Sequence, residues 1–107
     1  MALRPDLAII ADAVPATSRV LDVGCGDGEL MVALRGKDVD ARGLEIDPAN
    51  VTAAIARGQS VVQGDANQDL ADYPDNAFDY AILSQTLQTT ERPDRVVDEL
   101  LRTRRDA

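Results

Sequence analysis

The stretch Val20-Leu-Asp-Val-Gly-Cys-Gly-Asp-Gly28 predicts a buried strand that runs into a glycine-rich turn and then opens a helix. In an open α/β sheet, a turn of this kind lies at the carboxyl end of a strand, where nucleotide-like ligands bind. Its glycines are spaced G-x-G-x-G, and an acid, Asp22, lies within the strand. This spacing differs from the G-x-G-x-x-G of dinucleotide-binding turns, so it favours a different cofactor.

The composition limits the chain to one small domain and excludes several kinds of site. The 107 residues include no histidine and one cysteine, and the formal net charge is −8. Ser-His-Asp triads, Cys-His pairs, His and Cys metal clusters and disulfides within the chain are therefore excluded. The negative charge disfavours binding to nucleic acid or to an anionic membrane. One unpaired cysteine, with no export signal and no membrane-length apolar run, predicts a cytoplasmic protein.

Strands and helices are expected to alternate along the chain. Apolar spacing and turn residues predict strands at 19–23, 41–46, 60–63 and 78–84, and helices at 6–14, 29–35, 48–57 and 93–104. This order predicts an α/β fold with a mostly parallel sheet and helices on both faces. The basic residues Arg102, Arg104 and Arg105 are expected to complement the carboxyl end of the last helix rather than to bind nucleic acid.

Acidic residues are expected to gather at one edge of this sheet. Asp22, Glu45 and Asp65 lie at the ends of the first three predicted strands, and Asp27 and Glu29 begin the first helix after the glycine turn. Glu45 comes about twenty residues after the turn, a spacing typical of an acid that binds ribose hydroxyls. Carboxylates would repel a pyrophosphate and attract an ammonium or sulfonium group. The pattern therefore favours an adenosine with a cationic tail, such as S-adenosylmethionine, over NAD.

Each of these features also has a purely structural explanation. The glycines can serve only a tight turn, the first-turn acids only the helix dipole, and Glu45 can be a solvated strand end. Cys25 is expected to be a small packed residue rather than a reactive thiol. Asp65 can either cap a loop or bind an adenine amino group. Nothing in the spacing is specific to a magnesium ion near Asp65 and Asp69.

Motifs along nearly the whole chain resemble those of one superfamily. Val20–Gly28 matches a first motif, Gly43–Pro48 a second-strand motif, and Gly64-Asp65 and Phe78–Ser84 fall where third and fourth motifs are expected. Together they resemble the class I S-adenosylmethionine-dependent methyltransferases, which implies a Rossmann-like parallel sheet flanked by helices. More narrowly, the chain is similar to the MetW family of methionine biosynthesis, through Leu44–Pro48, Ile55–Gly58, Leu83–Gln88 and Arg92–Asp94.

The resemblance implies which residues bind the cofactor, S-adenosylmethionine or S-adenosylhomocysteine. The methionine side of the pocket would be lined by Asp22, Gly24, Cys25, Gly26 and Gly28. The remaining contacts would be Glu45 to the ribose, Ile46 to the adenine face, Asp65 and Ala66 to the adenine edge, and Ser84 and Gln85 to the sulfonium. The resemblance carries over no catalytic residue and no metal ligand.

The same resemblance implies a function in methionine biosynthesis. A MetW-like protein would bind S-adenosylmethionine and act beside a homoserine O-acyltransferase, as its activating partner. The alternative is a methyltransferase of a small molecule, whose acceptor site would lie beyond residue 107. The lack of histidine near the sulfonium fits the first hypothesis but does not exclude the second, because methyl transfer can proceed by positioning alone.

Residues 1–107 are expected to form the cofactor-binding N-terminal part of such a domain, without the C-terminal strands of the family. The fourth predicted strand would then become an apolar edge instead of a central strand. We expect an isolated chain to self-associate through that edge, unless the sequence is part of a longer polypeptide.

Overall fold

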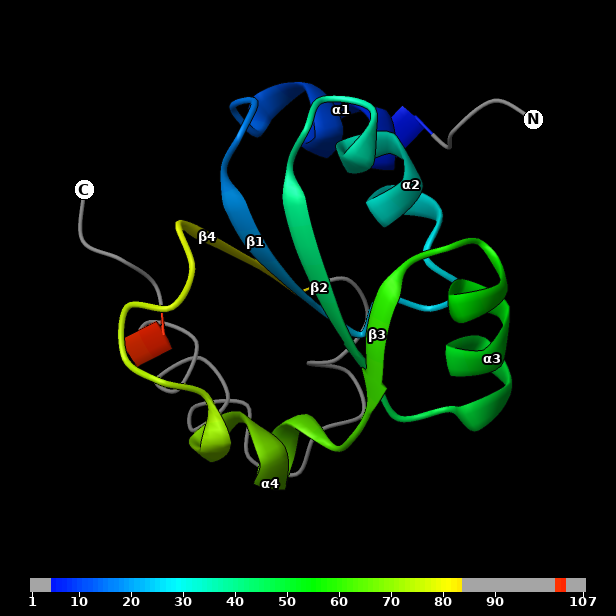
Figure 1. Cartoon of the computed structure of the whole chain (residues 1–107), viewed down its shortest axis with the longest axis vertical. Coiled ribbons are helices and arrows are strands. Elements are labelled where there is room, and N and C mark those ends of the chain that lie inside the picture. Colours follow the sequence, from blue (N-terminus) through cyan, green and yellow to red (C-terminus); the bar gives the residue numbers. More distant parts are fainter. Residues whose placement is uncertain (1–4, 84–101, 104–107) are drawn as a thin grey trace.

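The computed structural model describes residues 5–83 and 102–103, and these form a four-stranded sheet with flanking helices (Figure 1). The elements are α1 (Pro5–Ala13), β1 (Arg19–Val23), α2 (Glu29–Arg35), β2 (Asp40–Glu45), α3 (Pro48–Ala56), β3 (Ser60–Gln63), α4 (Ala66–Asp69), the 3-10 helix η1 (Leu70–Asp72) and β4 (Tyr80–Leu83). All neighbouring strands pair in parallel, in the order β3-β2-β1-β4. The predicted α/β class with a parallel sheet is confirmed.

Helices α1, α2 and α3 cover one face of the sheet. Successive strand side chains point to opposite faces, so alternate residues of β1 and β2 face these helices. Val20 of β1 is buried with Leu34 of α2, and Met31 of α2 is buried with Ala54 of α3 and Val61 of β3. This packing places the start of α2 directly after the glycine turn and fixes the turn at the carboxyl end of β1.

A second layer of short elements covers part of the opposite face. Leu21 of β1 and Leu44 of β2 are buried against Leu70 of η1 and Phe78, which precedes β4. The aromatic rings of Tyr73 and Phe78 meet edge to face, with their centroids 5.8 Å apart. The segment between β3 and β4 thus completes the core over the centre of the sheet.

Arg102, near the end of the chain, makes hydrogen bonds to this second layer, which lies about thirty residues earlier in the sequence. Its guanidinium donates to the carbonyl oxygens of Leu70 at 2.9 Å and Tyr73 at 2.7 Å, and pairs with Asp75 at 2.6 Å. These carbonyls belong to the first residue of η1 and the residue after η1, so this contact is not the one expected with the carboxyl end of the last helix, which stays a prediction. Arg104 and Arg105 lie outside the described residues.

The observed elements agree with the predicted ones to within two residues at each described end. The exceptions are α4 and η1, which the sequence analysis missed because apolar periodicity cannot be recognised over a single turn. β4 begins later than predicted, since the N–H of Phe78 donates to the carbonyl of Thr103 at 3.0 Å instead of pairing with β1. The predicted last helix, residues 93–104, lies outside the described residues except for 102–103.

Among the described strands, β4 lies at the edge of the sheet beside β1. Its edge position was predicted and is confirmed. Tyr80 at the start of β4 is exposed, whereas the three residues after it are half-buried. Self-association through this edge stays a prediction.

Candidate functional site

The turn after β1 has a backbone conformation that glycine adopts most readily. Gly24, Gly26 and Gly28 have φ angles of +74°, +59° and +86°. A Cβ atom added to Gly28 would lie 3.1 Å from that of Ala54, so this glycine lets α3 pack beside the start of α2. A Cβ atom added to Gly26 would meet no atom of the described chain within 4 Å. The turn therefore exposes its backbone to open space at Gly26, where a ligand can approach it closely.

Glu45, at the end of β2, joins the glycine turn to the start of α3. Its carboxylate is buried, with Oε1 accepting from the N–H of Gly26 at 2.8 Å and Oε2 from the N–H of Asp47 at 3.0 Å. Glu45 thus lies at the same edge of the sheet as the turn, as its position at a strand end predicted, while its ribose contact stays a prediction. The two backbone bonds were not foreseen. Each carboxylate oxygen can accept a further hydrogen bond, so ribose binding and loop support are compatible.

Ile46 follows the buried Glu45 and is itself exposed. Its side chain retains 62% of its accessible surface. Gln63 at the end of β3 donates to the Ile46 carbonyl at 3.4 Å, which ties this segment to the neighbouring strand. The site thus has an apolar surface immediately beside a carboxylate, an arrangement that suits a flat base attached to a ribose.

Carboxylates around the turn act together on Cys25. The thiol is buried, and its pKa is raised to about 12, first by burial, then by Asp22 and Glu45, and to a smaller extent by Asp27. These acids come from two strand ends and the turn, so the predicted gathering of negative charge at this edge of the sheet is observed. Cys25 is a packed, neutral thiol, as predicted.

We expect Cys25 to resist alkylation in the folded protein. Thiolate is the reactive form, and a pKa of about 12 leaves on the order of one thiol in ten thousand ionised at pH 8. The labelling rate with iodoacetamide, followed by mass spectrometry, should therefore keep rising up to about pH 12 instead of levelling near pH 9. The chain unfolded in urea is the control and should label readily at pH 8. Fast labelling of the native protein at that pH would contradict the assignment.

Asp27 was expected to add negative charge to the site, but it is paired with a basic residue. Its carboxylate lies 3.3 Å from the guanidinium of Arg57 at the end of α3, and both side chains are close to half-exposed. An exposed pair adds little stability, but it offsets charge at the rim of the site. Most of the negative electrostatic potential at the turn therefore comes from the buried carboxylates of Asp22 and Glu45. Nothing in the sequence indicated this pair, because its members are 30 residues apart.

Asp65 is placed near Glu45 and caps α4. The N–H of Gly64 donates to the Glu45 carbonyl at 3.0 Å, which brings the end of β3 to the same edge. Asp65 Oδ1 accepts from the backbone and side-chain N–H groups of Asn67, both at 2.9 Å, and its own N–H donates to Asp69 at 2.6 Å. The capping role is thus observed, and the adenine contact stays a prediction. Among the described residues, no group of His, Cys, Asp or Glu side chains could hold a metal ion.

The other predicted site residues divide into two groups. Ala66 is buried in the core that Leu70 and Phe78 share, directly after Asp65. Ser84 and Gln85 lie outside the described residues, so their contact with a sulfonium stays a prediction.

Gly43 supports the site in a way that the sequence analysis missed. A Cβ atom at this position of β2 would lie 2.7 Å from Cys25 Sγ and 2.9 Å from Met31 Sδ. Only glycine lets the turn and α2 pack this closely on β2. A glycine inside a predicted strand often marks such a close approach, so the signal was present in the sequence.

The family and its relatives agree with this geometry. The family model for "Methionine biosynthesis protein MetW" matches residues 4–107. The chain belongs to the MetW family. A relative from Rhodopirellula baltica, the bifunctional methionine biosynthesis protein MetXA/MetW, is 36% identical over 114 residues. The match covers 98% of this MetW-family chain and 18% of the bifunctional protein.

Solved methyltransferases share the fold of this MetW-family chain. A SAM-dependent methyltransferase from Thermotoga maritima is 25% identical, with a TM-score of 0.78 over 94% of this chain and 45% of its own. Another from Archaeoglobus fulgidus, 22% identical, has a TM-score of 0.84 over 94% of this chain and 46% of its own. The predicted class I methyltransferase fold is confirmed, and the chain spans about half the length of these structures.

Proposed function

We propose that this MetW-family chain binds S-adenosylmethionine or S-adenosylhomocysteine at the carboxyl edge of β1 and β2. One observation carries the proposal: two buried carboxylates, Asp22 and Glu45, act on the glycine turn where Gly26 faces open space. Negative charge at this point attracts a sulfonium or ammonium group and repels a pyrophosphate. The likeness to a solved SAM-dependent methyltransferase at 25% identity supports the same ligand.

In this proposal, residues 1–107 form the cofactor-binding part of the domain, and the contacts follow the sequence prediction. Glu45 binds the ribose hydroxyls, Ile46 covers one face of the adenine, and Asp65 with Ala66 meets the adenine edge. The methionine moiety lies over the glycine turn near Asp22. Ser84 and Gln85 face the sulfonium.

Parallel calorimetric titrations test the choice of ligand. We expect S-adenosylmethionine and S-adenosylhomocysteine to bind at least about tenfold more tightly than NAD, a difference of about 1.4 kcal/mol. Methylthioadenosine is the matched control, because it keeps the adenosine and lacks the charged amino-acid tail. It should bind more weakly than S-adenosylmethionine. Tighter binding of NAD, or equal binding of methylthioadenosine, would show that negative charge does not select the ligand.

We further infer that the protein acts in methionine biosynthesis as the partner of a homoserine O-acyltransferase. The Rhodopirellula relative named MetXA/MetW joins both parts in one polypeptide, and such a link raises the effective concentration of parts that work together. The partner would be activated by the MetW-family chain. Co-purification of the two proteins, and a change in the acyltransferase rate on adding this chain, would support the inference.

A second candidate function is transfer of the methyl group to a small molecule. The solved relative from Thermotoga maritima, which is named as a methyltransferase, favours it. Incubation with labelled S-adenosylmethionine and a metabolite extract separates the two functions. Label recovered in an extract component would establish the methyltransferase.

We assign the protein to the cytoplasm. A single buried cysteine of raised pKa is compatible with a reducing compartment. In the part of the chain that the structure describes, no helix has the length and apolar character needed to cross a bilayer.

A further inference from the structure

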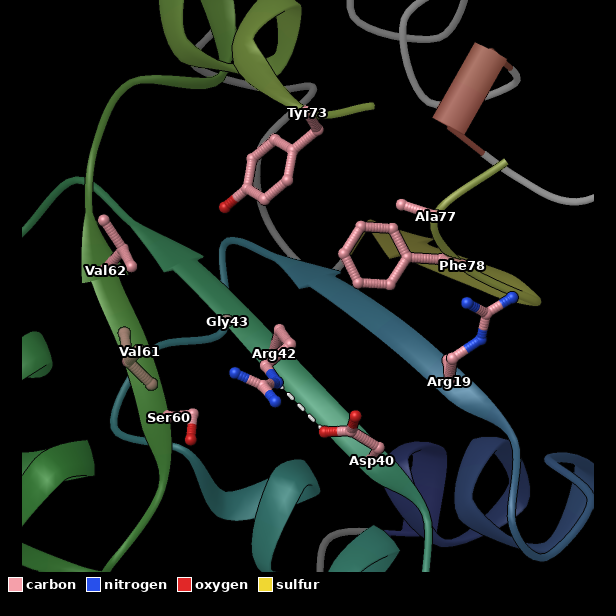
Figure 2. A pocket seen from close by; sticks show the side chains of 10 residues that line it. All are labelled: Arg19, Asp40, Arg42, Gly43, Ser60, Val61, Val62, Tyr73, Ala77 and Phe78. Atoms are coloured by element: carbon pink, nitrogen blue, oxygen red, sulfur yellow. Dashed lines mark hydrogen bonds and ion pairs between the residues drawn. The ribbon is translucent and has the colours of Figure 1, made fainter. Parts of the chain in front are cut away.

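A groove of about 450 Å³ lies over the face of β2 and β3 that helices α1, α2 and α3 do not cover (Figure 2). Arg42 of β2 and Val62 of β3 form its floor, and Arg19 of β1 lies at one end. Tyr73 and Phe78 form the facing wall, and Figure 2 shows the Tyr73 hydroxyl directed out over β2 and β3. In the described part of the chain, the second layer therefore stops short of this part of the sheet.

The charged end of the groove lies away from the candidate cofactor site. Its charged end lies at the amino ends of the strands, where Arg19, Asp40 and Ser60 are the first residues of β1, β2 and β3. Glu45 ends β2, so about 16 Å of strand lies between Asp40 and Glu45 at ~3.3 Å per residue. The other end of the groove is nearer, because Val62 pairs with Leu44, the residue directly before Glu45.

The groove combines two guanidinium groups with apolar surface. Arg42 is 57% exposed and pairs with Asp40 through Nε at 2.9 Å, and its terminal nitrogens have no partner among the described residues. Arg19 is 44% exposed and forms an ion pair with Asp79 at 3.6 Å, and its backbone N–H donates to the same carboxylate at 2.9 Å. Beside them, Val62 is 61% exposed. Each guanidinium has one aspartate beside it, so the terminal nitrogens of Arg42 next to Val62 are the part of this surface that suits a ligand with a carboxylate beside an apolar group.

The types of residue favour a protein over a small molecule. The chain has only two tyrosines and one phenylalanine, and Tyr73 and Phe78 are both in this groove. Arginine and aromatic residues are enriched at the energetic centres of protein interfaces. Among the described strands β3 is at the edge of the sheet, so the groove is open on that side to a large partner. The Rhodopirellula relative named MetXA/MetW joins a MetW part to a second, larger part in one polypeptide.

We infer that this groove docks the acyltransferase partner. A segment of that enzyme would present a carboxylate to Arg42 and Arg19 and an apolar side chain to Val62 and Phe78. The inference rests on the partnership proposed above and adds the surface that the partnership uses. Because the groove is small compared with a standard interface, it would be the anchor of a larger contact.

Four variants test the inference. Arg42→Gln and Val62→Lys change the groove, and Arg35→Gln and Ile55→Lys are matched controls at exposed positions of α2 and α3 on the other side of the sheet. The affinity of each for the purified homoserine O-acyltransferase of the same organism is measured by biolayer interferometry. We expect each groove variant to weaken the complex by about tenfold or more, and each control by less than about twofold. The affinity for S-adenosylmethionine should stay unchanged in all four, and only Arg35→Gln should melt at slightly lower temperature, because it loses the hydrogen bond from Arg35 to the Gly58 carbonyl.

The possible results separate this inference from the proposed function. If the parent chain forms no complex with the acyltransferase, the partnership and the docking surface are both wrong. If the parent binds and the groove variants bind equally well, or the controls weaken binding as much, only the docking surface is wrong. The groove could instead bind a second copy of this chain, and light scattering tests this alternative. Groove variants that no longer self-associate but still bind the acyltransferase would show that the groove is a self-association surface and would contradict the inference.

Discussion

Replacing Gly26 with valine should reduce the affinity for S-adenosylmethionine by more than about a hundredfold, or about 2.7 kcal/mol. A Cβ atom at this position meets no atom of the described chain within 4 Å, so the valine side chain would extend into the space from which a ligand approaches the turn. The N–H of Gly26 would still reach Glu45, because the substitution leaves the backbone donor in place. Calorimetric titration of the variant measures the loss.

Backbone strain needs its own control, since Gly26 has a φ of +59°. Gly58, with a φ of +82°, lies after α3 near the amino ends of the strands, where an added Cβ would lie 3.0 Å from the Arg35 guanidinium that donates to the Gly58 carbonyl. Gly58→Val therefore carries similar strain, roughly 1–2 kcal/mol. We expect both variants to melt at lower temperature and only Gly26→Val to lose binding. Equal affinities in the two variants would mean that the ligand does not lie over Gly26.

The sequence specifies most of the sheet because its signals are local. Val20–Gly28 combines an apolar strand with glycines, and Asp47-Pro48 combines a helix cap with a proline at the first helical position. The structure confirms both, with the Asp47 side chain accepting from the Ala49 N–H at 2.9 Å. Glu45 could be placed beside the turn because neighbouring parallel strands end at one edge of the sheet.

Contacts between distant segments could not be predicted in the same way. The pairing of Asp27 with Arg57 and the bonds from Arg102 to η1 depend on how the layers pack, and no short pattern encodes them. The α4 turn depends on the single cap Asp65 rather than on periodicity. The groove beside Arg42 was also not foreseen, because it results from where the second layer ends and not from any residue pattern.

Glu45→Ala should lower both the stability and the affinity for S-adenosylmethionine. The carboxylate accepts one backbone N–H from the glycine turn and one from the start of α3, and its removal leaves the Gly26 and Asp47 donors without this partner. The lost charge-assisted bonds should cost about 1–3 kcal/mol in the free energy of unfolding. Loss of the proposed ribose contacts should weaken binding by a further 1–3 kcal/mol, or roughly tenfold to a hundredfold.

Two further variants separate these effects. Asp47→Ala removes the cap of α3 and should cost about 1 kcal/mol of stability, while its backbone N–H still reaches Glu45. It should therefore bind S-adenosylmethionine like the parent chain. Glu45→Gln keeps one acceptor oxygen and replaces the other with a donor, so its stability and affinity should fall between those of Glu45→Ala and the parent. If Glu45→Ala loses stability and still binds like the parent in calorimetry, the residue only supports the turn. The ribose must then be bound elsewhere, because a carboxylate that held both hydroxyls could not be removed without a loss of affinity.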